Sequence, residues 1–240
     1  MIEGAKYIVS SGGAGLMSVT TYDILIYIHT LLFVYWLGAD LGVYLTAKYV
    51  ADRNLKLDER FRFMGVLMAV DMGPRTSLIL ILPIGFQMAS MLGISPITGL
   101  PLALIWIFCL AWAGASWVMY LNTGKPIANK IGATDRYIRI TVMLAMLVLG
   151  IVSLATGSPF ADKWLAVKAL LFAGVMSLGI YLRLQIADWI KGFAMVREGG
   201  EAADIGNDLI IAALARSKPA ALALWTGVAI IAFLGKVKPF

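Results

Sequence analysis

The amino-acid sequence predicts an all-α fold, a polytopic bundle of transmembrane helices with about six spans. Of the 240 residues, 60% are hydrophobic and 14% are charged, whereas soluble domains are about half apolar and about a quarter charged. The mean hydropathy is +0.85. Apolar runs long enough to cross about 30 Å of hydrocarbon recur along the whole chain. We therefore expect residues 1–240 to form a single transmembrane domain in contact with the lipid bilayer.

Six apolar segments, separated by polar or turn-forming residues, are the expected spans. They cover roughly residues 22–46, 63–92, 99–121, 138–156, 163–184 and 219–235. The second span contains Pro74 and Pro83, which predict a kink or a tilt. Pro96 and Pro101 mark the turn before the third span, and residues 157–159 (Gly-Ser-Pro) mark the turn before the fifth.

The largest segment outside the predicted spans is 185–218, a cytoplasmic connector. Residues 185–197 are expected to extend the fifth span as a helix, and residues 197–204 (REGGEAAD) form a polar break. Residues 207–218 (NDLIIAALARSK) are amphipathic. They fit either a short helix on the inner membrane surface or an ordered connector.

The distribution of Lys and Arg predicts the orientation. The loops after the first, third and fifth spans are basic, whereas the loop after the second carries no Lys or Arg and the loop after the fourth carries only Lys163. Basic loops stay in the cytoplasm, so both termini are expected outside, in the periplasm, with Lys6, Lys236 and Lys238 as exceptions. The basic loop residues include Lys48, Arg53, Arg60, Lys125, Arg139, Arg183 and Arg216.

Charge, cysteine content and motifs exclude several classes of function. The net charge of +6 lies in short loops between spans, which argues against nucleic acid as a partner. Cys109 is the single cysteine, so no intrachain disulfide is expected and the thiol is read as a small buried apolar group. Zinc, P-loop, dinucleotide-binding and catalytic-triad patterns are absent from the sequence. The first 20 residues lack the pattern of a cleavable signal peptide, so the first span is expected to direct insertion into the inner (cytoplasmic) membrane.

His29 is the only histidine, and it lies within the first span. An ionisable residue at membrane depth is costly and tends to mark a ligand or a pathway. His29 is about 10 Å from the outer end of its span and Lys168 about 7 Å from the outer end of the fifth, at 1.5 Å per residue. The two residues are therefore expected at similar depth. As alternatives, His29 is a hydrogen-bonded packing residue and Lys168 extends to the outer headgroups.

A second polar layer is expected nearer the cytoplasm. Asp40 follows His29 by about three helical turns, which places it on a similar face. Asp71 and Arg75 have the i, i+4 spacing of an intrahelical ion pair. These residues are a candidate proton relay between the cytoplasm and the outer site; the alternative is a neutralised cluster that orients the first two spans. Gly38 and Gly42 form a GxxxG pattern that permits close helix approach.

Imidazole commonly serves as an axial ligand of haem iron, so His29 is a candidate iron ligand. The chain has no second histidine. The other axial position would have to be filled by Met, Lys, Tyr, water or a residue from a partner. Lys168 is the most interesting of these because of its matched depth, and it would have to bind as the neutral amine.

Three segments carry a resemblance to the HemJ-type membrane proteins, which are associated with oxidation of protoporphyrinogen IX. They are the first-span segment IHTLLFVYWLGADLGVYL, the fifth-span segment WLAVKALLFAGVMSLGIYLRL and the C-terminal FLGKVKPF. The resemblance implies a haem b held by His29 and Lys168. Those proteins are shorter, and the second span with Asp71 and Arg75 has no counterpart in them. Related uncharacterised and copper-resistance-type membrane families also share a first-helix histidine, so the resemblance is to a superfamily.

Three hypotheses follow. In the first, the chain binds haem b and performs or supports a redox step as a haem-dependent membrane oxidoreductase, with porphyrinogen oxidation as the specific case. In the second, it is a non-catalytic subunit or anchor of a larger membrane complex, or a homo-oligomer. In the third, it is a transporter or metal-handling protein that uses Asp40, Asp71 and Arg75.

Overall fold

The computed structural model describes residues 19–240, and the predictions for Lys6 and for the start of the chain lie outside this range. The described chain consists of six α-helices joined by short turns. Each helix is long and apolar enough to cross a membrane, which confirms the predicted all-α membrane fold. The helices are α1 (Thr21–Val50), α2 (Leu57–Met91), α3 (Gly99–Leu121), α4 (Pro126–Thr156), α5 (Lys163–Glu198) and α6 (Gly200–Val237).

The start of α1 follows from local chemistry. The Thr20 hydroxyl accepts from the backbone N–H of Asp23, and the Asp23 carboxylate accepts from the backbone N–H of Thr20, at 3.0 Å. This capping box satisfies donors that a helix start leaves free. Pro74 and Pro83 both lie inside α2, where each removes one backbone hydrogen bond.

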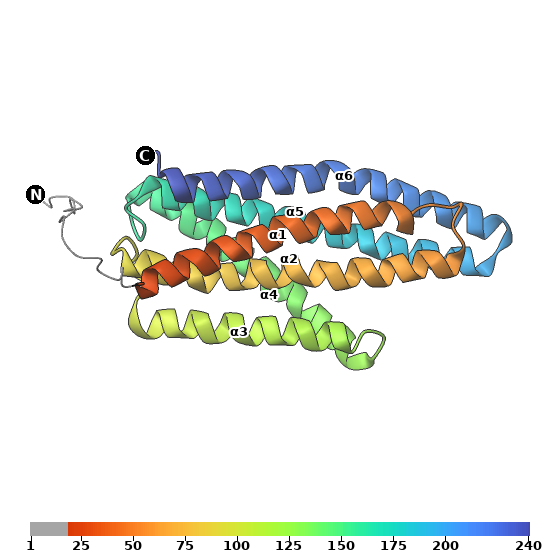
Figure 1. The fold of residues 1–240 in the computed structure, drawn as a ribbon, viewed down its shortest axis with the longest axis horizontal. Coiled ribbons are helices and arrows are strands. Elements are labelled where there is room, and N and C mark those ends of the chain that lie inside the picture. The colour runs from red at the N-terminus through yellow and green to blue at the C-terminus, as the bar shows by residue number, and fades with distance from the viewer. Residues whose placement is uncertain (1–18) are drawn as a thin grey trace, which may run out of the picture.

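The six helices form a ring in chain order (Figure 1). Each helix packs on its predecessor and its successor, and α1 packs on α6 to close the ring. Since consecutive helices run in opposite directions, the start of α1 and the end of α6 lie at the same end of the bundle. That end is called the terminal end below. Which side of a membrane it faces remains a prediction.

The connector 185–218 differs from its expected form. Helix α5 continues to Glu198 and α6 begins at Gly200, so the polar break reduces to Gly199, whose φ of 81° favours glycine. Residues 207–218 are the first part of α6 and run without interruption into the last span. No separate surface helix is present in residues 19–240. Hydrophobic burial explains this, because Ile210 and Ala213 pack against Trp189 and Phe193 of α5 in a core at the far end of the bundle.

Arg60, expected as a solvated loop charge, lies in that same far-end core and is 2% exposed. Its Nε donates to the backbone oxygen of Val50 at 2.8 Å, and its Nη1 donates to Asn207 at 2.7 Å. Its guanidinium also stacks over the ring of Phe193. Arg60 therefore ties α1, α2, α5 and α6 together.

Close approach of α1 and α2 involves one of the two predicted glycines. A Cβ on Gly42 would lie 3.2 Å from Val70, whereas a Cβ on Gly38 would meet nothing within 4 Å. A Cβ on Gly73 of α2 would lie 3.0 Å from Ala39. Farther inside the ring, Cys109 is 1% exposed in the central apolar core, as expected.

Candidate functional site

A large cavity of about 620 Å³ lies inside the ring near the terminal end. It is called the His29 cavity. Its volume is in the range of small-molecule and cofactor sites, about 300–1,000 Å³. Most of its wall is apolar, and the aromatic residues among its lining are Tyr22, Phe33, Trp36, Phe86, Phe160, Trp164 and Phe172.

His29 projects from α1 into this cavity and packs against α2 where that helix has no side chain. A Cβ on Gly85 would lie 3.6 Å from His29 Cε1. The Nδ1 atom of His29 is buried and has no hydrogen-bond partner in the described chain. The neighbouring Thr30 hydroxyl donates to the Ile26 backbone oxygen at 2.8 Å. Because Nδ1 is buried, a ligand in the cavity would have to bind the other ring nitrogen, Nε2, which also forms no hydrogen bond within residues 19–240.

Lys168 reaches the same cavity from α5 and lies against the backbone of α6. A Cβ on Gly235 would lie 2.8 Å from Lys168 Nζ, so the absence of a side chain there makes room for the amine. Within residues 19–240, no hydrogen bond or ion pair to Lys168 is formed. The structure thus brings His29 and Lys168 to one cavity from helices that are far apart in the sequence.

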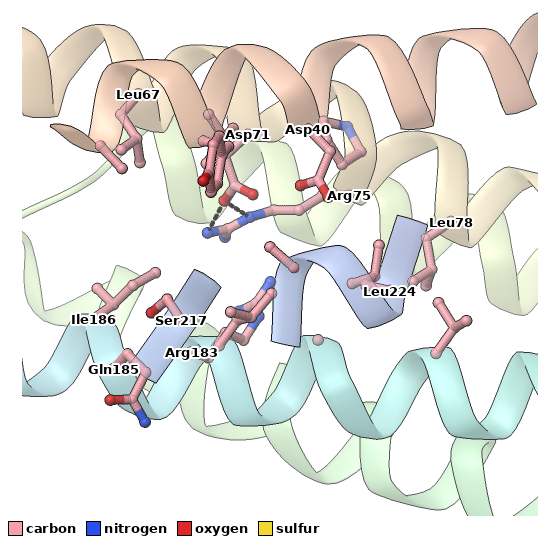
Figure 2. A pocket seen from close by; sticks show the side chains of 18 of the residues that line it. Asp40, Leu67, Asp71, Arg75, Leu78, Arg183, Gln185, Ile186, Ser217 and Leu224 are labelled. Atoms are coloured by element: carbon pink, nitrogen blue, oxygen red, sulfur yellow. Dashed lines mark hydrogen bonds and ion pairs between the residues drawn. The ribbon is translucent and has the colours of Figure 1, made fainter. Parts of the chain in front are cut away.

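A second, smaller cavity of about 160 Å³ lies farther from the terminal end and is lined by Asp40, Asp71 and Arg75 (Figure 2). It is called the Asp40 cavity. Arg75 Nε donates to Asp71 Oδ2 at 2.5 Å, which is the ion pair expected from the i, i+4 spacing. Asp40 Oδ2 instead accepts from Trp225 Nε1 of α6 at 2.8 Å. The three residues predicted as a relay share one cavity, but ion pairing joins only Asp71 and Arg75.

Sequence reasoning missed a second charged group beside this cavity. Asp135 is 3% exposed, and its carboxylate accepts from Arg139 at 2.8 Å, Arg183 at 3.1 Å and Trp112 at 2.8 Å. Arg139 and Arg183 were counted with the basic loops because they stand at the ends of the predicted spans. In the structure α4 begins at Pro126 and α5 continues to Glu198, so both arginines lie well inside helices. Asp135 and Arg139 have the same i, i+4 spacing as Asp71 and Arg75, a signal that could have revealed them.

Trp36 is the only described residue that lines both cavities. It is 3% exposed and meets Phe172 edge-on, with ring centroids 6.2 Å apart. Leu78, Leu82 and Met176 belong to the same apolar cluster. A proton route from the Asp40 cavity to His29 would therefore have to pass a packed apolar layer.

No protein-family model, curated protein or solved structure matches this chain. No group of three or more His, Cys, Asp or Glu side chains that could hold a metal ion occurs within residues 19–240. Haem iron is also held by the porphyrin and needs only axial protein ligands.

Proposed function

We propose that this multi-pass membrane protein lies in the inner (cytoplasmic) membrane and binds haem b in the His29 cavity. His29 would be one axial ligand, and Lys168 the second ligand or a close polar neighbour. The observation that carries the proposal is that an imidazole and a lysine with no ion-pair partner within residues 19–240 line one large, aromatic-walled cavity. The resemblance to HemJ-type proteins is consistent with the same two residues.

The residues present fit a haem in three respects. The aromatic walls suit a flat apolar ring, Nε2 of His29 forms no hydrogen bond within residues 19–240 and is not buried as Nδ1 is, and Gly85 and Gly235 leave space beside the imidazole and the amine. When bound, haem supplies one-electron redox chemistry whose potential depends on its axial ligands and surroundings. Here the apolar walls would exclude water from the ring.

The specific reaction proposed is oxidation of a porphyrinogen, in which the substrate would give up electrons to an external electron acceptor and release an equal number of protons. Asp40 is the best candidate in this chain to exchange a proton. Asp71 and Asp135 are each held by an arginine, whereas Asp40 accepts only from the neutral indole of Trp225. Its other oxygen, Oδ1, forms no hydrogen bond within residues 19–240 and can hold a proton at the Asp40 cavity.

The absorption spectrum of the purified, haem-replete protein tests this proposal. We expect a Soret band with b-type bands on reduction, lost in His29→Ala and shifted in Lys168→Met. Thr46→Val is the matched control for the first variant because Thr46 lies on α1 outside the cavity lining and its hydroxyl is already bonded within the helix. Lys163→Met is the control for the second because Lys163 lies on α5 but does not line the cavity.

A folded, haem-replete preparation without a Soret band would refute the proposal. Co-purification of a stoichiometric membrane partner in that case would favour the subunit hypothesis. Ion-dependent stabilisation that is lost in Asp71→Asn would favour the transporter hypothesis.

A further inference from the structure

The polar groups that line the His29 cavity carry only positive or neutral character. Lys168, Lys236 and Lys238 contribute to the lining, and no Asp or Glu of the described chain does so. The Asp40 cavity differs, because carboxylates accompany its arginines. An ammonium group beside an apolar cavity gains most from an anion that can share the site.

Lys236 lies in the last turn of α6 and Lys238 directly follows that helix, whose end lies at the terminal end of the bundle (Figure 1). Both are exposed, so they form the mouth of the cavity, while Lys168 lies deeper. Lys238 is held in place: its backbone N–H donates to Leu234 at 3.0 Å, and its ammonium lies 5.4 Å from the ring centroid of Trp164. Trp164 itself lines the cavity.

We propose that Lys236 and Lys238 bind the carboxylate groups of a tetrapyrrole whose apolar ring enters the His29 cavity. This inference rests on the proposed function and adds the polarity of the ligand and its orientation. The carboxylates remain at the hydrated mouth, where their solvation cost is small, and the ring is buried among the aromatic walls. Lys168 is left free to face the ring centre together with His29.

Anionic lipid headgroups are the other source of the same chemistry, because lysines at a membrane surface attract them. A lipid phosphate would neutralise the mouth without any preference for the ligand in the cavity. If the two lysines bind the carboxylates of a tetrapyrrole, the protein should bind a porphyrin acid more tightly than its ester. This preference should depend on the two lysines. The test therefore compares these two ligands in lipid of defined charge.

The full chain is placed in nanodiscs of phosphatidylcholine and titrated with metal-free protoporphyrin IX or its dimethyl ester, with tryptophan quenching as the readout. We expect the wild type to bind the acid at least about tenfold more tightly than the ester, the effect of a charge-assisted hydrogen bond. In Lys236→Gln/Lys238→Gln the ratio should fall to about one. Lys163→Gln, on the same end of the bundle but outside the cavity lining, should keep the wild-type ratio.

Equal binding of acid and ester by the wild type would overturn the inference, as would an unchanged ratio in the double glutamine variant. A ratio that depends on the lysines only when phosphatidylglycerol is present would assign them to lipid and also overturn it. Charge reversal in Lys236→Glu/Lys238→Glu should favour the ester. The metal-free ligand needs no axial residue, so His29→Ala should keep the ratio.

Binding of the iron porphyrin distinguishes the proposed axial ligation by His29 from the proposed carboxylate site at Lys236 and Lys238. A lysine-dependent ratio together with an unaltered haem spectrum in His29→Ala would refute the proposed axial ligation and leave the carboxylate site standing. A haem spectrum that is lost in His29→Ala, together with an acid-to-ester ratio that does not depend on the two lysines, would support the axial ligation and refute the carboxylate site. Failure of the wild type to bind either porphyrin would refute both.

Discussion

The two cavities of this bundle differ in the partners of their charged side chains. Around the Asp40 cavity, arginines meet carboxylates: Arg75 pairs with Asp71, and Arg139 and Arg183 share Asp135. In the His29 cavity, the imidazole Nδ1 has no hydrogen-bond partner within residues 19–240, and Lys168 forms no ion pair with a carboxylate of those residues. The ion pairs join the helices to one another, whereas His29 and Lys168 face a cavity large enough for a ligand.

The sharpest test of this contrast is Asp135→Ala. It should lower the free energy of unfolding by about 3–5 kcal/mol, because the buried Arg139 and the partly buried Arg183 both lose their shared carboxylate. Detergent-micelle unfolding followed by circular dichroism measures it. Asp188→Ala is the matched control, since its pair with Arg216 is 31% and 44% exposed and should cost at most about 1 kcal/mol. Equal losses would show that the Asp135 group is not a structural ion pair.

A comparison within the Asp40 cavity should give a smaller effect. Asp71→Asn breaks a partly buried ion pair and should cost about 1–3 kcal/mol, between the values for exposed and buried pairs. Asp40→Asn keeps an oxygen that can accept from Trp225, so it should cost less than about 1 kcal/mol. If Asp40 exchanges protons, this variant should also weaken the pH dependence of the haem midpoint potential, measured by redox titration. A larger stability loss in Asp40→Asn than in Asp71→Asn would contradict the assignment.

The next test alters the His29 cavity without removing a charge. Gly235→Ala introduces a methyl group 2.8 Å from the Lys168 amine, so the amine must shift and haem binding should weaken about tenfold, ~1.4 kcal/mol. Gly85→Ala adds a methyl group at an ordinary 3.6 Å from His29 and should change the affinity by less than about threefold, ~0.7 kcal/mol. Spectrophotometric haem titration measures both. The reverse order would show that Lys168 does not face the ligand.

The smallest effect is expected for Arg53→Gln, which sets the baseline for an exposed pair. Arg53 bonds Asp208 at 2.5 Å, but the two side chains are 47% and 74% exposed. Loss of this pair should change the free energy of unfolding by at most about 1 kcal/mol, again measured by circular dichroism. A cost near that of Asp135→Ala would remove the distinction between exposed and buried pairs in this bundle.

Hydropathy predicted the six helices and their order, and residue spacing predicted the Asp71–Arg75 pair. Rise per residue also predicted that His29 and Lys168 lie at similar depth, and both line one cavity. These features depend on local periodicity and on the thickness of the bilayer, which a single sequence expresses directly.

Hydropathy placed some residues near the polar ends of helices in loops, whereas the structure buries them. Arg60 and Arg139 look like loop charges in a hydropathy profile, yet they are 2% and 6% exposed. Their partners come from packing: Asn207 bonds Arg60 from α6, and Arg183 of α5 shares the partner of Arg139. Similarly, the Trp225–Asp40 bond joins residues 185 positions apart. No local spacing rule reports such contacts.

Packing also gives Lys236 and Lys238 a location that the charge count did not predict. By charge count they were exceptions to the expected orientation of the chain. In the structure they line the His29 cavity, which gives them a specific location. A charge that fits poorly with a topology rule is therefore worth examining as a ligand-binding group.

The ring of helices in chain order also sets a sequence of events during assembly. Each helix can pack on the one before it as it enters the membrane, but the contact between α1 and α6 has to wait for the last segment of the chain. The His29 cavity takes its walls from α1, α2, α4, α5 and α6, so it is complete only after that final step. A nascent chain that stops before α6 should insert its earlier helices and still be unable to hold the ligand, which makes ligand retention a check on finished synthesis.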